Sequence, residues 1–274
     1  MPSRTDLHTH TTASDGTLTP EELFDKAAGL GVRVLAITDH DSTNGYDALQ
    51  PLRSRHPDVR LVPGIEMSAE GDKPCHLLGY FINPTGQAFQ TSLRQLRDKR
   101  VERVRAMADK LGQLGIELDW SRIVAQAKGG CLGRPHLADA LLERRIVKTR
   151  QEAFDRFLKR NGPAYVAQDE PRSRQTIELI RNAGGVAVLA HPSYDTSEEL
   201  LKALVSEGLN GIEAYYPDHS RSLTQRYLEM AKDLQLVVTG GSDFHGPRTG
   251  RTALASVTVP EDVLEILEKR SQNI

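Results

Sequence analysis

Residues 4–10 read Arg4-Thr5-Asp6-Leu7-His8-Thr9-His10, a short run that carries two histidines two positions apart. The β-branched and apolar residues of this run favour a β-strand over residues 4–9. Side chains alternate between the two faces of a strand, so the imidazoles of His8 and His10 point to the same side. They can therefore bind one metal ion together, and the run predicts a strand whose end carries metal ligands.

The same pattern of a short apolar run followed by an amphipathic one recurs along the chain. The first helix is expected to begin at Thr19-Pro20-Glu21-Glu22, a capping box with proline at the first helical position. Further strands are expected over residues 33–37, 60–65, 76–81, 186–190, 211–215, 236–239 and 254–259, and further helices over 173–183, 197–207, 220–234 and 261–270. Strands that alternate with helices predict an α/β protein with a mostly parallel sheet, and about seven such units favour a closed barrel.

Residues 87–164 interrupt this alternation. Residues 92–114 have a long, charged helical pattern, and no convincing strand follows before residue 165. We therefore expect a small helical domain at 87–164, inserted into a barrel formed by residues 1–86 and 165–274. This insertion holds 17 Lys and Arg against 9 Asp and Glu, whereas the remainder holds 18 basic and 28 acidic residues. A basic lid suits an anionic substrate and an acidic barrel suits cations; an ordinary solvated helical surface is the alternative.

Composition excludes several classes of protein. With 274 residues, 38% hydrophobic and 26% charged, the chain is typical of a globular protein with one large core or a core and a smaller unit. No apolar run approaches the roughly 20 residues that span a bilayer, and no signal peptide precedes the first motif. Cys75 and Cys131 lack zinc-binding or CxxC spacing. Two free thiols favour the reducing cytoplasm.

Nine potential metal ligands gather near the ends of the expected strands. Most lie at or just beyond a carboxyl end, the rim where active sites of β/α barrels assemble, whereas His76 opens its strand. A single histidine is more often a core or surface residue, but so many at strand ends predict a shared site. The nine residues are His8, His10, Asp15, His40, Glu66, His76, His191, Asp243 and His245.

The chemistry of these ligands narrows the choice of metal. Imidazole and carboxylate without thiolate suit Mn²⁺, Fe²⁺ or Zn²⁺ and argue against a calcium site. A structural zinc site is disfavoured because it is closed by four ligands and is usually rich in thiolate. Nine ligands exceed what one ion uses, so we expect two or three ions that share bridging carboxylates. Such clusters activate water at neutral pH and neutralise the charge on phosphate oxygens.

At these residues the sequence resembles the PHP (polymerase and histidinol phosphatase) family. The resemblance covers essentially the whole chain and rests on five motifs and one isolated residue. They are Asp6-Leu7-His8-Thr9-His10 with Ser14-Asp15-Gly16, Thr38-Asp39-His40, Gly64-Ile65-Glu66, Ala190-His191-Pro192 and Ser242-Asp243-Phe244-His245, together with His76. The family implies a distorted (β/α)₇ barrel of the TIM type with a trinuclear metal centre. Among the metals that suit these ligands we expect manganese, with Fe²⁺ or Zn²⁺ as alternatives.

The resemblance also implies how the ligands are shared. His8, His10, Glu66 and Asp243 would hold one ion, Glu66, His76 and His191 a second, and Asp15, His40 and His245 a third. Asp15, Glu66, His191 and Asp243 would act at the reacting centre, and Asp39 would orient a ligand.

Within the family, the insertion is similar to that of bacterial enzymes of the RNase AM type. The residues concerned are Arg100-Val101-Glu102-Arg103, Gly133-Arg134-Pro135-His136 and Gly162-Pro163-Ala164-Tyr165-Val166. This likeness implies a phosphoric monoester hydrolase that converts 3′,5′-nucleotide bisphosphates such as pAp to AMP and phosphate. It also implies a 5′–3′ exoribonuclease activity on short 5′-phosphorylated RNA.

Five residues are expected to bind the substrate. Arg134 offers a planar fork for phosphate oxygens, and His136 is a second donor; a helix start is the alternative for this pair. Arg100 and Arg103 lie in the basic helical pattern, where a solvated helix face is the alternative. His219 follows Tyr215 on an expected rim loop. We expect no membrane contact and no obligate protein partner.

Two rival functions remain at this stage. Histidinol-phosphate phosphatase fits the family signature, but the basic insertion would repel a cationic substrate. A non-catalytic nucleic-acid-binding or polymerase-associated module would often lose metal ligands, whereas the set here is intact.

Overall fold

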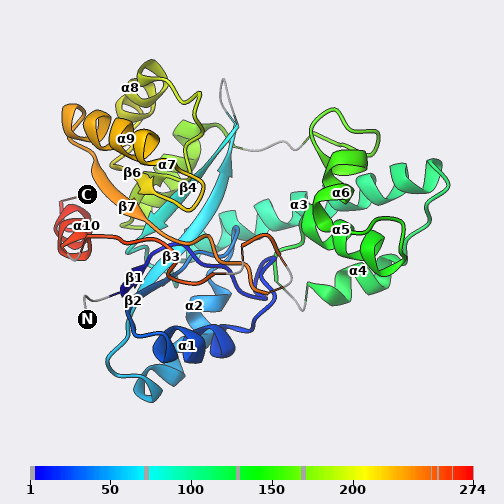
Figure 1. Cartoon of the computed structure of the whole chain (residues 1–274), viewed down its shortest axis with the longest axis horizontal. Helices are drawn as coiled ribbons and strands as arrows, with labels where there is room; N and C mark the ends of the chain where they lie inside the picture. The colour runs from blue at the N-terminus through cyan, green and yellow to red at the C-terminus, as the bar shows by residue number, and fades with distance from the viewer. Residues whose placement is uncertain are drawn as a thin grey trace.

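The computed structural model describes residues 4–70, 74–127, 130–167, 171–247, 249–251, 253–260 and 262–273. Its centre is a seven-stranded sheet in which the strands lie side by side in chain order (Figure 1). The strands are β1 (Arg4–Asp6), β2 (Val32–Ile37), β3 (Arg60–Ala69), β4 (Cys75–Tyr80), β5 (Val186–Leu189), β6 (Gly211–Tyr215) and β7 (Val237–Gly240). The predicted α/β class and mostly parallel sheet are confirmed.

One strand runs against the others. β4 pairs antiparallel with β3 and with β5, whereas the remaining neighbours pair in parallel. The first residues of β4 therefore lie at the same edge of the sheet as the carboxyl ends of the other strands. His76 pairs with Ser68, and its carbonyl accepts a hydrogen bond from Ala190 N at 3.0 Å. The reversal explains why His76 opens its strand and still reaches the same edge as the other ligands.

The sheet curls until its first and last strands meet. Leu7 N donates to Gly240 O at 3.3 Å, and His10 N donates to Phe244 O at 2.9 Å. Thr9 and Phe244 form a parallel bridge. These contacts join the carboxyl ends of β1 and β7, so the ends of the sheet that carry the predicted ligands are brought around a common centre.

The remaining elements of this part of the chain are helices that cover the sheet. They are α1 (Pro20–Gly29), α2 (Asn44–Leu49), η1 (Gln50–Arg55), α7 (Ser173–Asn182), α8 (Glu198–Ser206), α9 (Arg221–Asp233) and α10 (Val263–Ser271). The predicted capping box of α1 is present, since Thr19 Oγ1 accepts from Glu22 N at 3.2 Å and Thr19 N donates to Glu22 Oε2 at 2.8 Å. Buried Leu23 and Phe24 of α1 pack with β2. Within the described ranges, none of the helices combines the length and apolar character that crossing a bilayer requires.

The regular elements in the described part of residues 87–164 are all helices, joined by turns and loops. The elements are α3 (Gln87–Gln113), α4 (Trp120–Gln126), α5 (Arg134–Glu143), α6 (Arg150–Ala153) and η2 (Phe154–Leu158). α3 contributes to two hydrophobic cores: Phe89 and Leu93 pack against the sheet, whereas Val104 and Met107 pack among α4, α5 and η2. This helix thus extends from the sheet into the helical insertion (Figure 1). The division into two domains stays a prediction.

The strand expected at residues 254–259 is wrong. The described residues 253–260 contain no strand: Leu254 and Ala255 form a turn in which Ala255 has a φ of +53°. Leu254 and Val259 are buried against different clusters of the core. This apolar, β-branched run is therefore buried by irregular packing and does not pair with a neighbouring strand in the described residues.

The two cysteines differ in exposure. Neither Cys75 nor Cys131 forms a disulfide. Cys131 is buried, which raises the pKa of its thiol to about 12, whereas Cys75 lines a cleft beside β4.

We expect a thiol reagent at pH 8 to modify Cys75 in the native protein and to leave Cys131 unreacted, because only the thiolate reacts. Spectrophotometric thiol titration should count one reactive thiol per native chain and two after denaturation. Two thiols that react at similar rates in the native protein would contradict the buried position of Cys131.

Candidate metal centre

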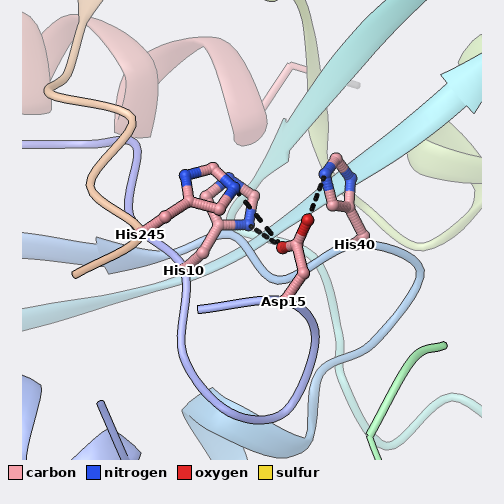
Figure 2. A group of neighbouring side chains, drawn as sticks. All are labelled: His10, Asp15, His40 and His245. Carbon is pink, nitrogen blue, oxygen red and sulfur yellow. Dashed lines mark ion pairs between the residues drawn. The ribbon is translucent and has the colours of Figure 1, made fainter. Parts of the chain in front are cut away.

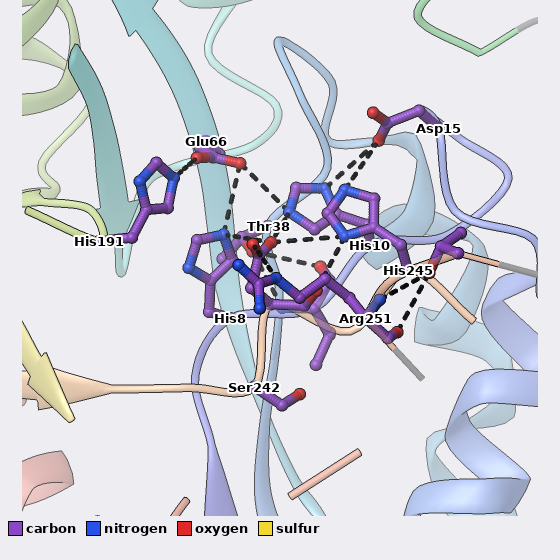
Figure 3. Close-up of polar contacts among 12 residues, drawn as sticks. His8, His10, Asp15, Thr38, Glu66, His191, Ser242, His245 and Arg251 are labelled. Carbon is purple, nitrogen blue, oxygen red and sulfur yellow. Dashed lines mark hydrogen bonds and ion pairs between the residues drawn. The ribbon is translucent and has the colours of Figure 1, made fainter. Parts of the chain in front are cut away.

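The nine predicted ligands converge at one edge of the sheet. Figure 3 shows six of them: His8, His10, Asp15, Glu66, His191 and His245. The nine ligands form four overlapping groups, in each of which the donor atoms lie within 4.8 Å of one another. The groups are His10, Asp15, His40 and His245; His8, His10 and Asp243; His8, Glu66 and His191; and His40, Glu66 and His76. Glu66 lies inside β3, which continues to Ala69, rather than just beyond a strand that ends at residue 65.

Glu66 lies between the groups and faces five imidazoles. Its Oε1 is 2.7 Å from His76 Nδ1 and 3.0 Å from His191 Nε2. Its Oε2 is 3.1 Å from His10 Nε2, 3.3 Å from His8 Nε2 and 3.3 Å from His40 Nδ1. Two ligands bound to one tetrahedral ion at about 2.1 Å are about 3.4 Å apart. The spacing therefore fits a carboxylate that is shared between ions, with one oxygen toward each side.

Two further carboxylates face the same imidazoles. Asp243 Oδ1 is 3.4 Å from His8 Nε2 and 3.3 Å from His10 Nε2. Asp15 Oδ1 is 3.4 Å from His245 Nε2, and Asp15 Oδ2 is 3.9 Å from His40 Nε2 (Figure 2). The three carboxylates therefore connect all the groups.

Among the described residues, several ligand atoms are buried without a hydrogen-bond partner. They are His8 Nε2, both ring nitrogens of His10, His40 Nδ1 and Asp15 Oδ1. A buried polar atom that lacks a partner costs about 1–3 kcal/mol. Metal ions bound among these atoms would satisfy one nitrogen of each ring and the Asp15 oxygen, so the residues present fit a multinuclear metal centre.

The electrostatics of the centre favour cations. Burial disfavours ionisation of Asp15, Glu66 and Asp243, but the surrounding imidazoles hold the pKa of each carboxyl well below its usual range. Burial likewise favours a neutral His10, yet the adjacent carboxylates of Asp243 and Glu66 raise its pKa to about 10. Burial lowers the pKa of His40 to about 3, which leaves that ring neutral and able to bind a metal. Because a metal binds the unprotonated ring, loading must displace a proton from His10.

Asp39 positions the loop that carries Asp15. Its Oδ1 accepts hydrogen bonds from Thr11 N at 2.7 Å and Ser14 Oγ at 2.6 Å, and its Oδ2 accepts one from Thr11 Oγ1 at 2.7 Å. Within the described residues, the hydrogen bonds of the Asp39 carboxylate thus go to this loop rather than to a metal ligand. Gly45 leaves the space for Asp39, because a Cβ at this position would lie 2.1 Å from its Oδ2.

Asp6 holds the loop that carries Asp243 in the same way. Its carboxylate accepts hydrogen bonds from Ser242 N at 2.8 Å, Ser242 Oγ at 2.6 Å and Ala255 N at 2.7 Å. Asp243 itself has a φ of +51°, a conformation that needs support from its surroundings. Tyr216 provides a further contact, since its hydroxyl donates to Asp243 Oδ2 at 2.8 Å.

Glu213 is a functional residue that the sequence analysis missed. It is fully buried in β6, and its Oε1 lies 3.0 Å from His8 Nδ1 while its Oε2 accepts from His191 N at 2.8 Å. A carboxylate can only accept, so His8 Nδ1 carries the proton and His8 Nε2 is left for a metal. His191 has a φ of +25°, which the bond from its backbone helps to hold. A glutamate inside an apolar strand was the available signal, because buried carboxylates are rare unless they are paired.

Arginines from the insertion line a cleft together with metal ligands. Arg103, Arg134 and Arg160 line a cleft of about 580 Å³, whose lining also includes His76 and His191. Arg103 also contacts the Tyr165 ring and donates to Val166 O, and Arg134 lies over the Phe154 ring. Two of the predicted substrate residues therefore line the same cleft as two of the metal ligands, and Arg160 joins them although it was not predicted.

The other predicted substrate residues have protein partners. His136 is buried at the start of α5, where its Nδ1 accepts from Gly133 N at 3.1 Å. Each nitrogen of His219 lies 2.9 Å from a backbone carbonyl, that of Ala214 or that of Pro192. Arg100 pairs with Asp41. Substrate contact by these three residues stays a prediction that their partners do not favour.

Imidazoles and carboxylates cluster at the carboxyl edge of an α/β sheet, and arginines line a cleft beside them. This arrangement defines a metal-dependent hydrolase for anionic substrates. The chain belongs to the PHP domain family, which matches residues 6–240. This confirms the family that the motifs indicated.

Three curated relatives span most of this chain and most of their own length. The chain is 35% identical over 260 residues to phosphoribosyl 1,2-cyclic phosphate 1,2-diphosphodiesterase of Eggerthella lenta, covering 93% of this chain and 98% of the relative. It is 35% identical to the 5′-3′ exoribonuclease Rnm of Salmonella typhimurium, with coverages of 88% and 85%. It is 32% identical to the 3′,5′-nucleoside bisphosphate phosphatase of Chromobacterium violaceum, with coverages of 89% and 88%.

A solved structure supports the same family. A proposed metal-dependent phosphoesterase from Bifidobacterium adolescentis superposes with a TM-score of 0.91 at 31% identity, covering 98% of this chain and 97% of that chain. The whole fold, including the helical insertion, is therefore similar to that of a family member.

We expect Glu213→Gln to weaken metal binding about 10–100-fold, the usual effect of losing a carboxylate that orients a metal ligand. The amide has one accepting oxygen where Glu213 bonds both His8 Nδ1 and His191 N. Titration of the metal-free protein with Mn²⁺ against a competing chelator measures the effect. Glu229→Gln, which changes an exposed glutamate on α9, is the matched control, and equal affinities of the two variants would contradict the role of Glu213.

Proposed function

We propose that this protein removes the 3′-phosphate from 3′,5′-nucleotide bisphosphates, converting pAp to AMP and phosphate, and that it also releases nucleotides from the 5′ end of short 5′-phosphorylated RNA. The observation that carries the proposal is the cleft that His76 and His191 of the metal centre line together with Arg103, Arg134 and Arg160. A substrate with two phosphates can contact the metal centre and the arginines at once.

The metal centre is proposed to be trinuclear and to use manganese, with Fe²⁺ or Zn²⁺ as alternatives. The allotment implied by the family resemblance agrees with the contacts of Glu66, whose two oxygens face different imidazoles. When bound, such ions lower the pKa of water and neutralise charge on phosphate oxygens. The residues of this chain determine where the ions would bind. Four of them are proposed to act at the reacting centre as members of the ligand groups described above: Asp15, Glu66, His191 and Asp243.

Arg103, Arg134 and Arg160 are proposed to bind the phosphate that does not react. Arg134 presents a planar guanidinium that can contact two phosphate oxygens together. Holding the 5′-phosphate there places the 3′-phosphate near the metal ligands, so binding energy at one end of the substrate orients the other. The helical insertion, residues 87–164, would then act as a lid domain over the barrel, and the two free thiols suit a reducing cytoplasm.

The names of the three relatives share a chemical theme. Each describes a ribose that carries one phosphate and a second phosphoester on another ribose oxygen, as a bisphosphate, an RNA chain or a cyclic phosphate. The cyclic phosphodiester is a second candidate substrate, because the Eggerthella lenta relative matches 93% of this chain. Histidinol phosphate lacks a second anionic group for the arginines.

Assays of four compounds side by side test the proposal: pAp, phosphoribosyl 1,2-cyclic phosphate, short 5′-phosphorylated RNA and histidinol phosphate. Hydrolysis of histidinol phosphate alone would refute it.

Replacing Asp15 or Asp243 by Asn should lower kcat about 10²-fold or more, since each removes a fixed charge from the reacting centre. Replacing His8 or His10 by Ala should have a similar effect, and Glu66→Gln should be at least as severe because Glu66 contacts several groups. Steady-state kinetics at saturating Mn²⁺ provide the measurement. Turnover near that of the unchanged protein in these variants would refute the assignment.

Arg134→Ala should reduce kcat/KM for pAp about 10–150-fold, the loss of one charge-assisted hydrogen bond, and should barely affect a 3′-monophosphate. Arg134→Lys should recover only part of the loss, because an ammonium does not reproduce the bidentate fork. Arg122→Ala, which changes an exposed arginine on α4 paired with Glu143, is the matched control. Equal losses on the two substrates would show that Arg134 serves the reacting phosphate or the fold.

A further inference from the structure

The helical insertion contacts the residue that follows a metal ligand. Asp41 comes directly after His40, and α3 contacts it twice. Arg97 Nη1 donates to the Asp41 carbonyl at 2.8 Å, and Arg100 Nε donates to Asp41 Oδ2 at 2.5 Å. Arg100 Nη2 also donates to Ser68 Oγ of β3 at 2.9 Å.

This ion pair is shielded from water. The side chain of Asp41 is 3% exposed and that of Arg100 is 11% exposed. Asp41 has a φ of +46°, a left-handed conformation that aspartate adopts only with support. Its backbone N donates to Glu66 O at 2.9 Å, so it also connects the His40 loop to the strand that carries the bridging carboxylate. Removing one partner of such a pair leaves the other charge buried and uncompensated.

The insertion makes a second contact on the loop that leads to Asp15. Cys131 N donates to Ala13 O at 2.9 Å. Gly130 allows the close approach, because a Cβ there would lie 2.5 Å from the carbonyl carbon and oxygen of Ala13. The loop therefore contacts the insertion two residues before Asp15.

Each of the two contacted loops supplies one member, Asp15 or His40, of the same ligand group. That group consists of His10, Asp15, His40 and His245 (Figure 2). Glu66 and His76 lie within strands of the sheet, whereas Asp15 and His40 lie on loops that the insertion contacts. We propose that the insertion positions this group through the Arg100–Asp41 ion pair, and that Arg100 is a positioning residue for metal binding rather than a ligand of the substrate phosphate. The inference rests on the proposed metal centre but not on the identity of the substrate.

Arg100 is a useful test because it also lines a small cavity with Asp15 and His40. A phosphate-binding Arg100 and a positioning Arg100 predict different results. Loss of a phosphate ligand would spare metal binding and would impair only substrates that carry the phosphate it holds. Loss of a positioning residue would weaken one of the bound ions and would impair every substrate equally.

The experiment compares Arg100→Gln, Arg100→Lys and Asp41→Asn with the double variant Arg100→Gln/Asp41→Asn in the full chain. Calorimetric titration of the metal-free proteins with Mn²⁺ should show one ion bound about 10–100-fold more weakly in Arg100→Gln and in Asp41→Asn. The double variant should lose no more than the worse single variant, since both remove the same contact. Arg100→Lys keeps the charge and should recover part of the affinity. Arg94→Gln, which changes an exposed arginine of the same helix, should bind as the unchanged protein does.

Kinetics provide the second measurement. At limiting Mn²⁺, Arg100→Gln should lower kcat/KM for pAp and for a 3′-monophosphate by the same factor, and added Mn²⁺ should reverse much of the loss. Unchanged metal binding together with a loss confined to pAp would overturn the inference. If the unchanged protein itself binds fewer than two ions, the proposed metal centre fails; if it binds them and Arg100→Gln binds them equally well, only the present inference fails.

Discussion

The rest of the structure depends on the Glu66 carboxylate and the five imidazoles that surround it. Glu66, His8 and His10 are buried, whereas His40, His76 and His191 are partly exposed, and within the described residues several of the ring nitrogens have no hydrogen-bond partner. Buried carboxylates and unsatisfied imidazoles are costly unless cations join them. The order of the strands, the reversal of β4 and the meeting of β1 with β7 all bring ligands from distant parts of the chain to this point.

Buried carboxylates also hold the loops around the centre. Asp39 forms hydrogen bonds to the loop before Asp15, and Asp6 forms hydrogen bonds to the loop that carries Asp243. Glu213 orients the His8 ring in the same way. Burial raises the pKa of Asp6 and of Asp39, and their hydrogen bonds to backbone and hydroxyl donors act in the opposite direction. The same hydrogen bonds hold the ligand loops in place, which is the preorganisation that electrostatic catalysis requires.

The sequence predicted which imidazoles and carboxylates gather at one edge of the sheet, because most of them occupy local motifs near the ends of strands. That they bind metal ions stays a prediction. The direction of β4 is not encoded in a local pattern, so the position of His76 was explained only by the structure. Glu213 meets His8 across 205 residues of chain, and such a pairing becomes visible only when the sheet is formed. The run 254–259 was mistaken for a strand, since apolar alternation can also be satisfied by irregular packing. Arg100 was predicted to bind the substrate from the family resemblance and the basic charge of the insertion, whereas in the structure its side chain pairs with Asp41.

Anomalous diffraction from crystals of the manganese-loaded protein, recorded at the manganese edge, tests the central claim most directly. Two or three peaks should lie among the nine ligands, with at least one on each side of Glu66, and each peak should be about 2.0–2.2 Å from nitrogen or oxygen atoms. A single peak at saturating Mn²⁺, or peaks that lie away from Glu66, would contradict a multinuclear centre joined by this carboxylate.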